Sequence, residues 1–155
     1  MTAKKLLIVG HVPSPNTLRL REAAEAGAKS PDIEGVEVTA ASPFDLGPDD
    51  VLAANAVLLG TTENLGYMSG ALKDFFDRTY YPVLDKTEGL SYALYIRAGH
   101  DGTGTRRAVE SIATGLRWRA VQDPLILRGE WQEAFVGQVE ELGMLMAAGL
   151  EAGIF

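Results

Sequence analysis

The sequence predicts an α/β fold in which helices cover both faces of a five-stranded parallel sheet. Short apolar runs alternate with longer amphipathic stretches along the whole chain, which is the order expected of repeated βα units. The runs at residues 5–10 and 55–61 are continuously apolar, as in strands that are buried on both faces. No internal repeat, low-complexity tract or linker interrupts the pattern, so we expect a single domain over residues 1–155.

The strands are predicted from apolar runs that end at glycine, proline or polar residues. The first run ends at Gly10, and the segment 42–50 that follows the second is rich in Pro, Gly and Asp. We expect that segment to be a loop leading to a short helical turn. The five predicted strands are residues 5–10, 36–41, 55–61, 91–97 and 124–127.

The helices are predicted from apolar side chains that recur at helical spacing. The clearest pattern lies at residues 69–81, and Pro82 is expected to end that helix. Its buried face would be formed at positions i, i+3, i+4, i+7 and i+8 by Leu72, Phe75, Phe76, Thr79 and Tyr80. The four predicted helices are residues 17–29, 69–81, 103–118 and 131–150.

The composition excludes several classes of function. The chain has 155 residues and no cysteine, which excludes disulfides, thiolate metal sites and cysteine nucleophiles. Any redox chemistry would therefore need a bound cofactor. The net charge of −7 argues against a nucleic-acid partner. No apolar run approaches the roughly 20 residues of a membrane span, and the start of the chain resembles a strand rather than a signal peptide. We therefore expect a cytoplasmic protein.

The loop after the first predicted strand is the first of three candidate binding loops. Because the N-terminus of a helix presents unpaired N–H groups, it favours an anion such as phosphate. Short polar side chains add further donors there, although simple capping of the helix by Ser14 or Asn16 explains them equally well. The candidate residues are Val12, Pro13, Ser14, Pro15, Asn16 and Thr17.

The second loop joins the third predicted strand to the helix at 69–81. It is polar and contains one large aromatic residue, Tyr67, which suits a flat ring with polar edges better than it suits a hydrolytic nucleophile. Gly66 would allow the backbone to approach such a ring closely. The alternative is an ordinary strand–helix connection capped by Ser69. The candidate residues are Thr61, Thr62, Glu63, Asn64, Leu65, Gly66, Tyr67 and Met68.

The third loop follows the fourth predicted strand and is rich in glycine. The spacing of its glycines resembles that of a dinucleotide-binding motif. Because the loop does not lie in a first βαβ unit, this is only weak evidence for dinucleotide binding. His100 and Asp101 would either orient a hydride donor or form an exposed polar tip. The candidate residues are Ala98, Gly99, His100, Asp101, Gly102 and Gly104.

The second loop and the helix after it resemble the corresponding segment of flavodoxin-like flavoproteins, a group that includes NAD(P)H-dependent FMN reductases and quinone reductases. The matching residues are Gly60, Thr61, Gly66, Met68, Leu72, Lys73, Phe75, Phe76, Asp77 and Arg78. The resemblance implies a three-layer sandwich with strand order 2-1-3-4-5, and FMN bound by the three loops. In the phosphate loop, Ser14 and Thr17 match the family's hydroxyl positions, whereas Val12 and Pro15 replace a hydroxyl and a glycine.

The resemblance also implies a function. FMN would take a hydride from NAD(P)H and pass electrons to a quinone-like acceptor, and the protein would form a homodimer or homotetramer. Tyr80, Tyr81, Trp118 and Trp131 are candidate exposed aromatics for that interface. One alternative is an electron carrier that serves a redox partner protein, and another is a binding protein that has lost FMN. No catalytic residue is assigned, and no metal is expected.

A basic stretch stands apart from this acidic chain. Residues 97–128 contain six arginines and only three acids. Arg106 and Arg107 lie near the start of the helix beside the third loop, where they would attract the phosphates of NAD(P)H. Solvated helix faces with local ion pairs are the alternative.

Overall fold

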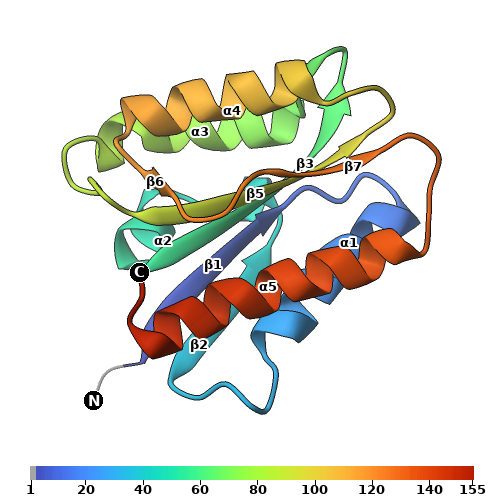
Figure 1. The fold of residues 1–155 in the computed structure, drawn as a ribbon. Coiled ribbons are helices and arrows are strands. Elements are labelled where there is room, and N and C mark those ends of the chain that lie inside the picture. The colour runs from blue at the N-terminus through green and yellow to red at the C-terminus, as the bar shows by residue number, and fades with distance from the viewer. Residues whose placement is uncertain (1–2) are drawn as a thin grey trace.

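The computed structural model describes residues 3–155 and contains a twisted sheet between two layers of helices (Figure 1). The main strands are β1 (Lys4–Gly10), β2 (Val36–Ala41), β3 (Ala56–Asn64) and β5 (Ser91–Ala98), and all their mutual pairings are parallel. The fifth strand is split into β6 (Arg119–Ala120) and β7 (Leu125–Arg128), both paired with β5. The predicted order 2-1-3-4-5 is therefore confirmed.

Helices cover both faces, as the sequence predicts. Figure 1 shows α1 (Pro15–Ala28) and α5 (Ala134–Ala152) on one face of the sheet. The other face carries α3 (Gly70–Val83) and α4 (Thr103–Gly115), with α2 (Pro48–Ala53) beside them. The loop after β2 contains a single 3₁₀ turn, η1 (Pro43–Asp45). None of the helices in residues 3–155 has the length and apolar character that crossing a membrane requires.

Two apolar clusters form the core, one on each face of the sheet. Leu72, Phe75 and Phe76 of α3 pack with Leu59 and Leu94 of the sheet in the first cluster. Leu6, Ile8 and Leu58 of the sheet pack with α1 and α5 in the second cluster. Alternate residues of each central strand enter opposite clusters, which explains why these strands are continuously apolar in the sequence.

Three predictions about helix ends and exposure are wrong. Pro82 lies inside the last turn of α3, and the helix ends at Val83. The helix predicted at residues 103–118 is α4, and it ends at Gly115 instead of continuing to Trp118. Trp118 is only 7% exposed and donates from Nε1 to Thr87 Oγ1 at 2.9 Å, so it belongs to the core and offers no surface for an interface. Helical spacing alone does not reveal where a chain leaves a helix while keeping its side chains buried.

Candidate functional site

The candidate site lies at the carboxyl edge of the sheet, where β1, β3 and β5 end. Gly10 is level with Gly60 across β1 and β3, and Gly60 is level with Tyr95 across β3 and β5. The N–H of His11 donates to Gly60 O at 3.0 Å, which continues the pairing into the first loop. The strand order reverses between β1 and β3, and ligands of open α/β sheets bind at such a reversal. All three predicted loops therefore start from neighbouring strands.

The first loop forms a capped helix terminus. Ser14 Oγ accepts the N–H of Thr17 at 3.2 Å, and Thr17 Oγ1 accepts the N–H of Ser14 at 3.0 Å. Pro15 is the first residue of α1, where its missing N–H leaves no helical bond unmade. Within residues 3–155, the N–H of Asn16 has no partner and remains a donor. Val12 and Pro13 lie in the connection before the cap, and partial burial lowers the pKa of the neighbouring His11.

The second loop is a β-hairpin, which the sequence did not predict. β3 continues to Asn64, and a short strand, β4 (Tyr67–Met68), returns antiparallel to it. The two turn residues, Leu65 and Gly66, have φ values of 54° and 75°, as a two-residue type I′ turn requires. Glycine in the second position was the available signal, but leucine is uncommon in a left-handed conformation. The turn presents Leu65 completely to solvent and Tyr67 41% exposed.

The hairpin is bound to the third loop through one carboxylate. Glu63 Oε1 accepts the N–H of His100, and Glu63 Oε2 accepts the N–H of Gly102, both at 2.9 Å. Hydrogen bonds to a charged acceptor are stronger than those between neutral groups. Gly102 has a φ of 71°, so the loop turns there in a left-handed conformation. Sequence patterns gave no indication that Glu63 would use these two donors.

Close backbone packing also joins the hairpin to the start of α4. Thr105 Oγ1 donates to Tyr67 O at 2.9 Å. A Cβ atom on Gly104 would overlap Gly66 O, so only glycine permits this approach. The structure therefore brings the second and third loops into direct contact. Within residues 3–155, no hydrogen bond connects Ser14 or Thr17 of the first loop to the hairpin.

Several predicted site residues present only their backbone to the edge. Thr61, Met68 and Ala98 bury their side chains, and Thr61 Oγ1 accepts the N–H of Ser69 at 3.0 Å. Thr62 Oγ1 donates to Asn64 Oδ1 at 2.8 Å, which stiffens the end of β3.

The tip of the third loop is polar and exposed. Gly99, His100 and Asp101 are exposed at the end of β5. The N–H of Thr103 donates to Asp101 Oδ1 at 3.0 Å, and this bond lowers the pKa of the carboxyl group. The Asp101 carboxylate is therefore negatively charged at neutral pH, and it lies beside the start of α4.

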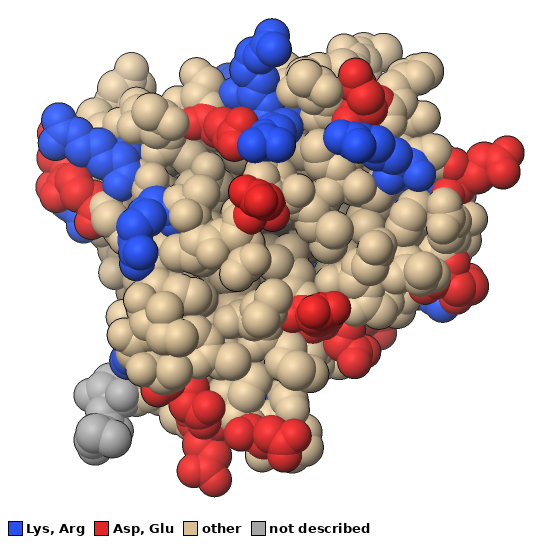
Figure 2. Space-filling view, in the orientation of Figure 1, with Lys and Arg blue, Asp and Glu red and all other residues tan. Residues whose placement is uncertain are grey.

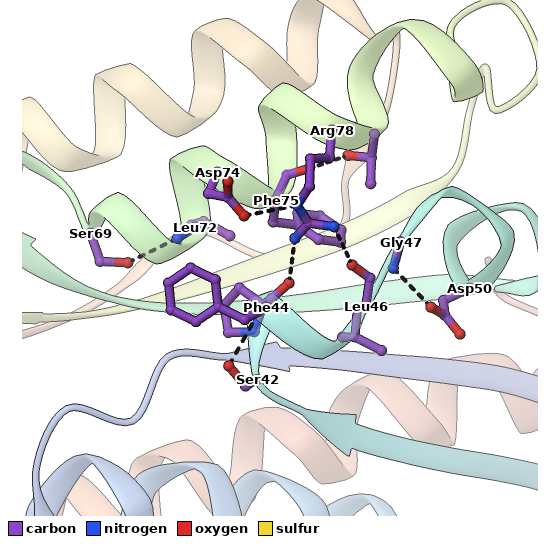
Figure 3. A network of polar contacts seen from close by, with 12 residues as sticks. Ser42, Phe44, Leu46, Gly47, Asp50, Ser69, Leu72, Asp74, Phe75 and Arg78 are labelled. Carbon is purple, nitrogen blue, oxygen red and sulfur yellow. Dashed lines mark hydrogen bonds and ion pairs between the residues drawn. The ribbon is translucent and has the colours of Figure 1, made fainter.

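The arginine of the matched helix has a structural role that sequence reasoning did not assign. Figure 3 shows Arg78 of α3 reaching the loop after β2, where it donates to Pro43 O and Leu46 O at 2.8 Å each. Asp74 Oδ2 accepts a hydrogen bond from Arg78 Nε at 2.8 Å. These bonds fix η1. Phe44 in this turn is 62% exposed, and its ring lies between Ser42 and the start of α3. Phe44 is thus a second exposed aromatic on this side of the molecule.

The hydrogen-bonding groups at the carboxyl edge of the sheet suit FMN in two of the three loops. The start of α1 offers the N–H of Asn16, which suits a phosphate. The Ser14 hydroxyl lies 2.9 Å from Thr17 Oγ1 and donates to it, so it would have to turn away from Thr17 to donate to a ligand. The hairpin offers a polar backbone turn and an exposed aromatic, which suit a flavin ring. The third loop fits less well, because Glu63 already accepts two of its N–H groups. Within residues 3–155, no group of three or more His, Asp or Glu residues is placed to hold a metal ion.

Comparison with known proteins identifies the fold. No protein-family model matches the chain. A flavodoxin of Aquifex aeolicus (strain VF5) is 30% identical over 112 residues, which are 72% of this chain and 60% of that relative's length. The structure of an archaeal flavodoxin has a TM-score of 0.78 at 22% identity, covering 94% of this chain and 98% of its own. An oxidoreductase from Corynebacterium diphtheriae has a TM-score of 0.70 at 14% identity, covering 99% of both chains. The chain therefore has the flavodoxin-like α/β fold.

Proposed function

We propose that this flavodoxin-like chain binds FMN at the carboxyl edge of its sheet and acts in redox reactions. The observation that supports the proposal most strongly is the contact between the hairpin and the third loop. It places an exposed aromatic and a polar backbone turn beside the strand reversal, on a chain similar to flavodoxins. Bound FMN would supply the centre that accepts a hydride and releases electrons, and the protein would supply position and electrostatics.

Two regions of this chain would bind different parts of the cofactor. The N–H of Asn16 would hold the phosphate, helped by the positive end of the α1 dipole. The Ser14 hydroxyl would also donate to the phosphate after turning away from Thr17 Oγ1, which is 2.9 Å from it. Thr17 would shape that turn, because its hydroxyl already donates to Ser14 O at 2.9 Å. The hairpin backbone from Glu63 to Tyr67 would meet the polar edge of the ring, with Tyr67 beside it. The Glu63 carboxylate would keep negative charge near that edge and so disfavour a negatively charged reduced flavin.

Replacing Ser14 by Ala tests the phosphate position. The loss of one charge-assisted bond of roughly 1.5–3 kcal/mol should weaken FMN binding about tenfold to a hundredfold. Riboflavin, which lacks the phosphate, should bind almost as it does to the original chain. Ser42→Ala is the matched control, because it removes another capping hydroxyl, one that accepts the N–H of Phe44 at 3.2 Å. Both affinities are measured by quenching of flavin fluorescence.

Equal losses for FMN and riboflavin would instead show general damage to the pocket. No loss for either ligand would remove this loop from the site. A chain that binds neither ligand would contradict the whole proposal and favour a binding protein that has lost FMN.

Within this redox function, we favour an NAD(P)H-dependent reductase that passes electrons to a quinone-like acceptor. An electron carrier for a redox partner protein is the second candidate, favoured by the similarity to flavodoxins. Rapid mixing of the oxidised holoprotein with NADH or NADPH separates the two. Bleaching of the flavin absorption by either nucleotide supports the reductase. Bleaching by dithionite alone supports the carrier.

A further inference from the structure

A hollow beside the third loop gathers arginine side chains from two elements. Its volume is about 280 Å³, and its walls come from the outer face of α4 and from β7. The lining residues are Thr103, Arg106, Arg107, Glu110, Ile126 and Arg128. The four residues from α4 recur at i, i+3, i+4 and i+7, so they share one helix face. Figure 2 shows basic side chains interspersed with acidic ones in the upper half of this view, where Figure 1 places α4 and β7, and mainly acidic ones below, over α5.

These arginines keep donors that the protein itself does not use. Within residues 3–155, the guanidinium group of Arg107 makes no hydrogen bond or ion pair. Arg106 contacts Glu110 only through Nε, at 3.2 Å. Arg128 donates through Nε to Asp101 O at 2.9 Å, and its terminal nitrogens have no partner in the same described range. Three guanidinium groups around one hollow therefore have unpaired N–H groups, on a chain whose net charge is −7.

The shape and charge of the hollow indicate its ligand. Planar guanidinium groups bind phosphate oxygens in pairs, which makes arginine well suited to phosphate recognition. A second hollow of about 380 Å³ shares Arg106 and Glu110 and continues along residues 120–124, past the gap between β6 and β7. Ile126 and Pro124 add apolar surface along this path, which suits a sugar or a base. The combined space lies in the range of small-molecule sites, roughly 300–1,000 Å³.

We propose that this hollow binds the phosphate groups of a nucleotide. The inference rests on the proposed function only in identifying that nucleotide as the NAD(P)H donor. The hollow adjoins the third loop directly, because Thr103 lines it and Arg128 bonds to Asp101 of that loop. A dinucleotide held here by its phosphates would extend its other end across the loop toward the hairpin. The donor would thus be recognised by residues outside the flavin loops.

Titration calorimetry on the full chain, as purified, tests this proposal with adenosine, 5′-ADP and 2′,5′-ADP. We expect adenosine to bind weakly and at least one phosphorylated nucleotide to bind well, more weakly as salt rises. A preference for 5′-ADP would indicate recognition of a diphosphate, and equal binding of 5′-ADP and 2′,5′-ADP would indicate recognition of the 5′-phosphate that they share. A preference for 2′,5′-ADP would indicate the extra phosphate of NADPH. Failure of both to bind better than adenosine would overturn the proposal.

Arginine variants supply the second arm of the test. Arg107→Gln should weaken nucleotide binding about tenfold, and Arg106→Gln combined with Arg107→Gln should weaken it about a hundredfold or more. Arg117→Gln is the matched control, because it removes the same charge from an exposed position on the loop after α4, outside the hollow. Equal affinities in the double variant and this control would overturn the proposal.

FMN binding is measured in the same variants, so that the two proposals fail separately. The arginine variants should bind FMN as the original chain does. A chain that binds the nucleotides but not FMN would contradict the proposed function and leave this site supported. A chain that binds FMN but no phosphorylated nucleotide would contradict this site alone.

Discussion

At the scale of single residues, the glycines at the carboxyl edge are explained by packing more than by a ligand. Gly60 belongs to the matched motif, but a Cβ atom there would overlap the ring of Tyr95. Within residues 3–155, the hydroxyl of Tyr95 is buried without a hydrogen-bond partner, and this burial raises its pKa. Gly104 is required in the same way by the carbonyl of Gly66. These two glycines allow close packing against Tyr95 and Gly66, and this packing maintains the geometry of the edge whether or not FMN is bound.

Glu133 provides a residue-scale prediction of pH dependence. Arg19 binds its carboxylate through both terminal nitrogens and Trp131 donates to it, which lowers the pKa of Glu133 from 4.5 to about 2. Because the folded pKa is depressed, the bridge stabilises the fold above pH 4.5, and that stabilisation disappears as the pH falls toward 2. The difference in Tm between the original chain and Glu133→Gln should therefore shrink over this range.

The control for this prediction is Glu141→Gln, which removes an exposed carboxylate from α5, the helix that begins directly after Glu133, and breaks no ion pair within residues 3–155. Its effect on Tm should stay small at every pH. High salt should also reduce the effect of Glu133→Gln, since the pair is exposed to solvent. A difference that persists unchanged at pH 2 would show that the bridge does not contribute through its charge.

At the scale of elements, the contact between α1 and α5 depends on two glycines. A Cβ atom on Gly27 would overlap Glu140 O of α5, and one on Gly143 would overlap Ala24 O of α1. The two backbones therefore approach more closely than helices with larger side chains at the contact allow. This approach closes the apolar cluster on that face of the sheet.

Replacing Gly143 by Ala should force the two helices apart. We expect a loss of about 1–3 kcal/mol in the free energy of unfolding, the usual cost of overpacking. Gly137→Ala is the matched control in the same helix, because its Cβ would meet no atom of residues 3–155 within 4 Å. That variant should gain roughly 0.5–1 kcal/mol through a better helix propensity. Urea denaturation measures both, and equal effects would show that the close approach carries no energetic weight.

At the scale of the whole molecule, binding of FMN should stabilise the fold. A ligand that binds only the folded state adds about 2.7 kcal/mol at a free concentration of 100 times Kd. For a chain of this size, that raises the Tm by roughly 5–11 °C. Riboflavin at the same concentration should raise it less, because it lacks the phosphate. A Tm unchanged by FMN would contradict binding to the folded protein. The predicted dimer or tetramer is checked independently by light scattering.

The sequence by itself determined the alternation of strands and helices, the parallel sheet and its three loops. Continuously apolar runs and helical spacing are local patterns, so the predicted bounds of most elements differ from the observed ones by one to three residues. The resemblance to flavodoxin-like proteins added the strand order, which the structure confirms. The loops that follow neighbouring parallel strands had to meet at one edge, and for that reason the candidate residues could be named in advance.

Only the tertiary structure decided how these loops are connected. The use of the third loop's donors by Glu63, the Arg78 bonds to the loop after β2 and the burial of Trp118 all depend on residues distant in sequence. Such contacts depend on how whole elements pack, and no local pattern encodes them. The arginine-lined hollow has the same origin, since α4 and β7 form it together only after the fifth strand pairs with β5.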